Sequence, residues 1–158
     1  MSFKLLKEAE QYYETVERRR DDGAKFRTKF DFYYLCLMAG LHFRQMGTLE
    51  QEKELNETAY FIDYYPEPFP DKVDLIVGLL IDAEMERKHI LPSDKKEVEK
   101  LMLDLIDHQS YTKLSSKGHK LLNLYAAGGF NRIKETILPT TELEVFLLHY
   151  MDLMNEPA

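Results

Sequence analysis

The hydrophobic positions of the chain repeat mainly at helical spacing. Near the N-terminus, apolar residues recur in steps of three and four at Phe3, Leu6, Ala9, Tyr12, Tyr13 and Val16. This pattern predicts a helix that has Ser2 as a candidate cap and stops near Asp22-Gly23. The alternation in Lys25–Phe30 predicts a short extended piece, and Asp31–Gln45, apolar on nearly all sides, predicts a central buried helix.

Four further helices are predicted from Asp71 onward. One begins at Asp71, one follows a cap at Ser93, one follows the polar link Ser110–Lys117, and the last begins within Thr140–Glu144. Few runs of β-branched residues are present to form a sheet. We therefore predict an all-α fold, with residues 1–158 forming a single compact bundle of about six helices.

Small residues occur at two places within the predicted helices. Ala39-Gly40 and Ala126–Gly129 are surfaces against which a second helix can pack closely, although Gly128-Gly129 is equally read as a helix break. The segment Leu49–Tyr65 is acidic and then aromatic, and Pro66–Pro70 cannot be helical because proline lacks a donor and restrains its predecessor. We predict an acidic, proline-rich connector here, with a hinge within residues 47–70.

The composition is that of a globular protein, with 158 residues, 44% hydrophobic and 31% charged. Cys36 is the only cysteine, so no disulfide or cysteine-based zinc site forms within the chain. The apolar runs Tyr33–Leu41 and Leu75–Ile81 fall short of the roughly 20 residues that span a bilayer. Because the N-terminus also lacks the pattern of a secretory signal, we expect a cytoplasmic protein without membrane contact.

Charge is unevenly distributed along the chain. The formal charge is −7, but residues 1–29 carry eight basic and six acidic side chains, whereas residues 49–86 carry two basic and eleven acidic ones. The candidate contacts to nucleic acid or an acidic partner are Arg18, Arg19, Arg20, Lys25, Arg27 and Lys29. The acids interleaved with them favour a solvated helix end as the alternative. The candidate aromatic anchors for a protein partner are Tyr60, Phe61, Tyr64, Tyr65 and Phe69.

The chain contains none of the common enzyme signatures. It has no P-loop, no glycine-rich dinucleotide turn and no Gly-x-Ser-x-Gly elbow. We therefore predict no catalytic residue, no bound metal and no cofactor. One alternative is a metal-dependent hydrolase, which requires two helices to bring together Glu86, His89, Asp104, Asp107 and His108.

Two segments resemble a known family of proteins. Phe26–Leu41, which ends in Met-Ala-Gly-Leu, and Leu122–Phe130, which contains Tyr-Ala-Ala-Gly-Gly, resemble small accessory proteins encoded with Dnd-type DNA phosphorothioation systems. The resemblance implies a helical accessory protein of a bacterial DNA-modification or phage-defence system, and it transfers no catalytic residue. The proline-rich connector and the longer middle depart from that pattern.

We predict a non-catalytic accessory or interaction subunit. It would contact a protein partner within a larger complex, and DNA through the basic N-terminal region. Self-association into a homo-oligomer is a further option that the sequence leaves open. A different hypothesis is an acidic inhibitor or DNA mimic that binds a basic partner through residues 49–86. This hypothesis predicts binding that weakens strongly with salt.

Overall fold

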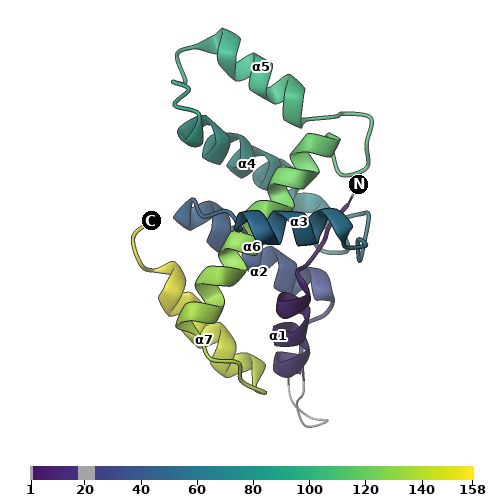
Figure 1. The fold of residues 1–158 in the computed structure, drawn as a ribbon, viewed down its shortest axis with the longest axis vertical. Helices are drawn as coiled ribbons and strands as arrows, with labels where there is room; N and C mark the ends of the chain where they lie inside the picture. Colours follow the sequence, from purple (N-terminus) through teal and green to yellow (C-terminus); the bar gives the residue numbers. More distant parts are fainter. Residues whose placement is uncertain (1, 18–23) are drawn as a thin grey trace. The chain divides into compact units, whose positions relative to one another are not determined.

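Helices dominate the computed structural model, which describes residues 2–17 and 24–158 (Figure 1). Over these residues the α-helices are α1 (Lys7–Glu17), α2 (Lys29–Phe43), α3 (Leu49–Glu57), α4 (Val73–Arg87), α5 (Lys95–Leu105), α6 (Ser116–Thr136) and α7 (Leu143–Met154), preceded at α4 by the short 3₁₀ helix η1 (Phe69–Lys72). The same residues contain no strand longer than an isolated bridge. The predicted all-α class is therefore confirmed, with seven helices where about six were expected.

Two compact units make up the described chain. Unit 1 comprises the residues up to Phe3 together with Tyr60–Leu122, and unit 2 comprises Lys4–Ala59 and Asn123–Ala158. The α6 helix contributes its first residues to unit 1 and its remainder to unit 2. No helix in the described ranges combines the length and the apolarity needed to cross a membrane.

Unit 2 is built around aromatic rings. The ring of Tyr12 lies 5.8 Å from Phe32, 5.7 Å from Phe130 and 5.9 Å from Phe146, measured between centroids. Its hydroxyl donates to the carbonyl of Ile137 at 2.8 Å, so the one polar atom of the ring is satisfied within the core. The central helix α2 supplies eight buried residues, which confirms the buried helix predicted from its apolar pattern.

Glycines let α2 and α6 approach each other within unit 2. A Cβ atom at Gly40 would overlap the carbonyl of Tyr125, and one at Gly129 would overlap the carbonyl of Cys36. A Cβ atom at Gly128 would likewise overlap the backbone carbonyl of Gln45. Because α6 continues through Gly128 and Gly129 without a break, the close-packing interpretation of these residues is correct.

The N-terminal predictions need two corrections. The first helix starts at Lys7, because Phe3 is instead held extended: its N–H donates to the carbonyl of Ile62 at 3.1 Å, and its carbonyl accepts from Phe61 at 3.0 Å. No extended strand forms over residues 25–30, since α2 already begins at Lys29. The predicted stop at Asp22-Gly23 lies outside the described residues.

The α3 helix occupies the first part of the predicted connector. Its N-cap is Thr48, whose hydroxyl accepts from the N–H of Gln51 while the Gln51 side chain accepts from the N–H of Thr48. Leu55 is its buried residue, and the amides of Gln51 and Asn131 exchange two hydrogen bonds of 2.8 Å. Leu49–Tyr65 is therefore partly helical and is not a continuous connector. The expectation that Pro66–Pro70 contains no helix is also wrong at its end, because the 3₁₀ helix η1 begins at Phe69 and a proline is tolerated in its first turn.

Within unit 1, α4 and α5 run side by side and antiparallel (Figure 1). The α5 helix is capped by Asp94, whose carboxylate accepts from the N–H of Glu97, so the cap lies one residue after the predicted Ser93. On α4, the fully buried carboxylate of Glu84 receives two hydrogen bonds from the Arg87 guanidinium, at 2.7 Å from Nε and 2.6 Å from Nη2.

Candidate functional site

The basic N-terminal segment is only partly described. Arg18, Arg19 and Arg20 lie outside the described residues. Lys25 and Arg27 are exposed, and Lys29 forms an ion pair of 3.0 Å with Glu10. A carboxylate oxygen of Asp31 accepts from the N–H of Arg27 at 2.7 Å, and one of Glu17 accepts from the N–H of Phe26 at 2.8 Å. Carboxylates thus lie among the described basic residues and reduce the local positive potential.

The predicted aromatic anchors separate into an exposed and a buried set. Tyr60 and Tyr64 are exposed and Phe61 is half-buried. Tyr65 and Phe69 are buried in unit 1, where the Tyr65 hydroxyl donates to the carbonyl of Thr112 at 2.9 Å. A partner can therefore reach the first three residues, while the other two build the core of the unit.

The acidic residues proposed for an inhibitor or DNA mimic lie on helices of two different units. The stretch 49–86 is divided between α3 in unit 2 and α4 in unit 1. The ligand cluster of the hydrolase alternative is also not assembled, because the described part of the chain has no group of three or more His, Cys, Asp or Glu placed to hold a metal ion. His89 lies beyond the end of α4 with a left-handed backbone (φ 56°).

A buried histidine is a polar feature that the sequence reasoning missed. His119 lies in the first turns of α6, and its Nε2 is 2.6 Å from the hydroxyl oxygen of Thr112. The ring of Phe3 meets the imidazole edge-on with centroids 5.2 Å apart. The Nδ1 atom of His119 has no hydrogen-bond partner among the described residues. Burial lowers the pKa of His119 from 6.5 to about 4, so the ring is neutral at physiological pH.

This lowered pKa makes the folding stability pH-dependent. Between pH 6.5 and 4 the unfolded chain binds a proton that the folded chain excludes, so the contribution of His119 is fully present above pH 6.5 and is lost on acidification. From pH 7 to pH 5 we expect a loss of about 2 kcal/mol in unfolding free energy from this residue. Denaturant titrations at both pH values measure the loss.

Two variants distinguish the contribution of His119 to the pH dependence of the unfolding free energy from that of the other titrating groups. His119→Gln keeps a polar atom near Nε2 but does not titrate, so its stability should fall less over this range. Gln109→Ala changes an exposed side chain that does not titrate and should leave the wild-type pH dependence. An unchanged pH dependence in His119→Gln would disprove the assignment.

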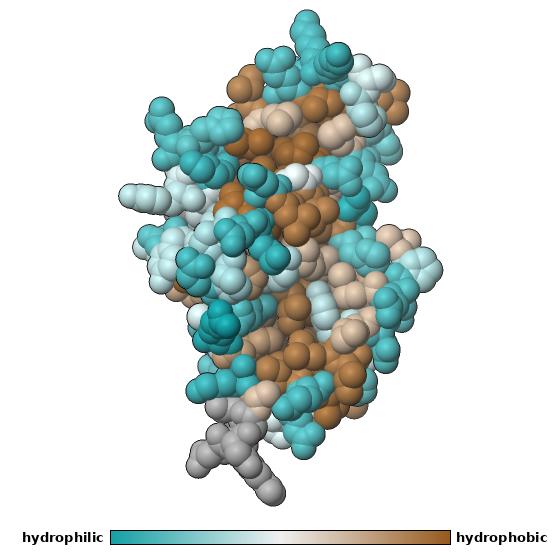
Figure 2. All heavy atoms as spheres, turned by 180° about the vertical axis from the view of Figure 1, so that it is seen from behind, coloured by the Kyte–Doolittle hydropathy of each residue, from teal (hydrophilic) through white to brown (hydrophobic). Residues whose placement is uncertain are grey.

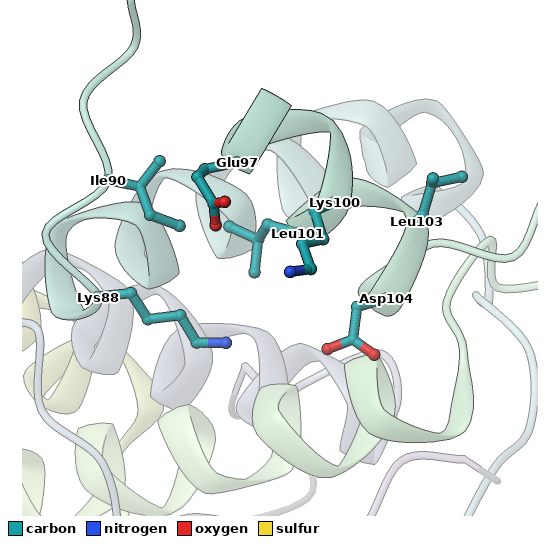
Figure 3. A pocket seen from close by; sticks show the side chains of 7 residues that line it. All are labelled: Lys88, Ile90, Glu97, Lys100, Leu101, Leu103 and Asp104. Atoms are coloured by element: carbon teal, nitrogen blue, oxygen red, sulfur yellow. The ribbon is translucent and has the colours of Figure 1, made fainter. Parts of the chain in front are cut away.

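Two hollows border α5 in unit 1. The first, of about 590 Å³, is shown in Figure 3. The carboxylates of Glu97 and Asp104 and the ammonium groups of Lys88 and Lys100 all point toward it. Asp104 also forms an ion pair of 2.6 Å with Lys117. Because the charges of this lining balance, the hollow selects neither a cation nor an anion.

The second hollow is an apolar groove between α4 and α5, which we call the α4–α5 groove. Its volume is about 370 Å³, and it is lined by Asp74, Val77, Gly78, Ile81, Met102, Ile106, His108 and Lys113. The charged and polar lining residues lie toward one end, where α4 begins and α5 has ended. Figure 2 shows apolar side chains exposed on the surface of the molecule, coloured brown. A groove of this size and lining suits an apolar ligand or a side-chain ridge of a helix.

Gly78 differs from the other helical glycines that the structure describes. Gly40, Gly118, Gly128 and Gly129 each have another backbone where a Cβ would be, whereas nothing lies within 4 Å of a Cβ built at Gly78. Glycine inside a helix costs about 1 kcal/mol relative to alanine. Among the described residues, no close contact explains why a glycine rather than an alanine occupies position 78.

Comparison with known proteins gives no assignment. No family model, no curated protein and no solved structure matches the chain. The resemblance to accessory proteins of phosphorothioation systems therefore stays a prediction, and the functional argument depends on the surface of the molecule.

Proposed function

We propose that this protein is a non-catalytic helical interaction subunit that binds a helix of a protein partner in the α4–α5 groove. The observation that carries the proposal is Gly78, a mid-helix glycine at an open apolar groove with no neighbour of its own chain over it. A partner backbone that approaches Gly78 closely would explain both the glycine and the apolar lining.

The charges beside the groove define the partner further. From Val73 to Glu86, α4 has no lysine or arginine, and its exposed side chains include Asp74 and Asp82. A partner helix that packs apolar residues on Val77 and Met102, with Lys or Arg facing α4, would complement the acidic side chains of α4. Within the lining itself Asp74 is balanced by Lys113, so it is the acidic exposed surface of α4 that favours a basic amphipathic helix as the partner segment.

The proposed biological setting is a bacterial DNA-modification or phage-defence complex in the cytoplasm. This setting rests on the family resemblance of Phe26–Leu41 and Leu122–Phe130. In that setting, the basic N-terminal segment would contact DNA while the groove holds the protein subunit.

Blocking the groove tests the proposal. Tagged wild type should purify from its native cell with a stoichiometric protein partner, and Gly78→Trp should lose this partner because the indole fills the groove. Glu99→Trp places the same side chain at an exposed position of α5 outside the groove lining and should keep the partner. Equal partner recovery with Gly78→Trp and wild type, or no partner with either, contradicts the proposal.

A smaller substitution separates folding from binding. Gly78→Ala should raise the unfolding free energy by about 0.5–1 kcal/mol, because alanine favours the helix and its methyl group meets nothing in the chain. The same methyl group should weaken the complex with the partner. Denaturant titration and a binding titration measure the two effects, and an improvement in both would contradict a backbone contact at Gly78.

A further inference from the structure

The outer face of α7 is a second surface without a cover in the described chain. Leu148 is 63% exposed and Met151 is 61% exposed, and they are neighbours on one face because they are three residues apart. The opposite face is fixed in unit 2, where Phe146 is buried and the Tyr150 hydroxyl donates to the carbonyl of Leu35 at 2.7 Å. A helix that is apolar on both faces is normally buried on both.

Acidic side chains flank this apolar face along α7. Residues 135–158 contain no lysine or arginine, and they carry five exposed carboxylates, on Glu135, Glu142, Glu144, Asp152 and Glu156. Glu144 and Asp152 each lie four residues from Leu148, so both flank it on the same face of α7. The outer face of α7 thus combines an apolar centre with a carboxylate on either side of it along the helix.

We infer that the outer face of α7 binds a basic amphipathic helix of another protein. The apolar side of such a helix would cover Leu148 and Met151, and its flanking Lys or Arg side chains would meet Glu144 and Asp152. Apolar centres surrounded by complementary charge are typical of protein interfaces. This surface is independent of the α4–α5 groove, since it shares no residue with the groove lining.

The same charges argue against a second copy as the occupant. A two-fold dimer places the same patch on both subunits, so a dimer through α7 would bring Glu144 and Asp152 of each copy toward carboxylates of the other. Like charges facing each other across an interface cost free energy, whereas a lysine-flanked helix gains it. These carboxylates therefore select a basic partner.

A designed peptide tests the inference on the full-length protein. The probe is a roughly 20-residue helix with leucines on one face and lysines beside them, and its matched control carries glutamate in place of lysine. With methionine methyl groups labelled for NMR, the lysine peptide should shift the Met151 signal. The Met102 signal, in the α4–α5 groove, reports separately on the site of the proposed function.

Charge substitutions at two of the exposed leucines complete the test. Leu148→Glu should weaken binding of the lysine peptide by about tenfold or more, because a carboxylate replaces the apolar centre. Leu49→Glu adds the same charge on exposed α3, where Leu49 is 78% exposed, and should bind like wild type. The inference is overturned if the glutamate peptide binds equally well, if Met102 shifts in place of Met151, or if Leu148→Glu converts a wild-type dimer to monomer.

Discussion

Replacing Gly129 with alanine should destabilise the protein by about 3 kcal/mol or more. The new Cβ would overlap the carbonyl oxygen of Cys36 and approach the amide nitrogen of Gly40, so α2 and α6 must separate. Overpacking of this kind usually costs 1–3 kcal/mol, and the cost is higher here because the obstacle is backbone, which cannot change rotamer. Denaturant unfolding followed by circular dichroism measures the change.

Gly78→Ala is the matched control for this experiment. Both substitutions replace a glycine inside a helix by alanine, and both gain the same helix propensity. Only Gly129 has another helix over it. Opposite signs of the change in unfolding free energy are therefore expected, and equal stabilisation by both variants would disprove the close crossing of α2 and α6.

Replacing Arg87 with methionine should destabilise unit 1 by about 3 kcal/mol. The substitution removes both guanidinium hydrogen bonds from the fully buried Glu84 carboxylate. Loss of one partner of a buried ion pair typically costs 3–5 kcal/mol, and the lower end applies because the Arg87 side chain is partly exposed to water. Thermal unfolding at neutral pH measures the loss.

The double variant Glu84→Leu with Arg87→Met tests the cause. Removing the buried charge together with its partner should recover most of the stability, because an apolar pair of similar size needs no hydrogen bonds. Lys88→Met, next along the chain and exposed, should change little. A double variant less stable than Arg87→Met would contradict the ion-pair explanation.

Much of the helical packing could be predicted from the sequence. Ala39-Gly40 and Ala126–Gly129 were identified as close-packing surfaces because residues without bulk allow backbones to approach, and the structure places them against each other in unit 2. The α3 helix was missed because Leu55 is its only buried residue, so it has almost no apolar period. Its capping box, Thr48 with Gln51, was the available signal.

The candidate surfaces were less accessible to sequence reasoning. Glu84 and His119 are polar residue types usually found exposed, and their burial depends on neighbours far along the chain or on adjacent turns. The α4–α5 groove depends on the register between two helices, which the apolar pattern of each helix alone does not fix. Leu148 and Met151 lie on the exposed face of the last helix, and the apolar pattern alone does not show that another protein could cover that face.

The burial of Cys36 makes the chain its own reporter of conformational opening. Cys36 is the only cysteine, it is fully buried beside the crossing of α2 and α6, and burial raises the pKa of its thiol. A thiol reagent can therefore modify the folded protein only during moments when unit 2 opens. The rate at which a thiol reagent labels Cys36 in the wild-type protein would therefore report how often unit 2 opens, and no probe has to be introduced.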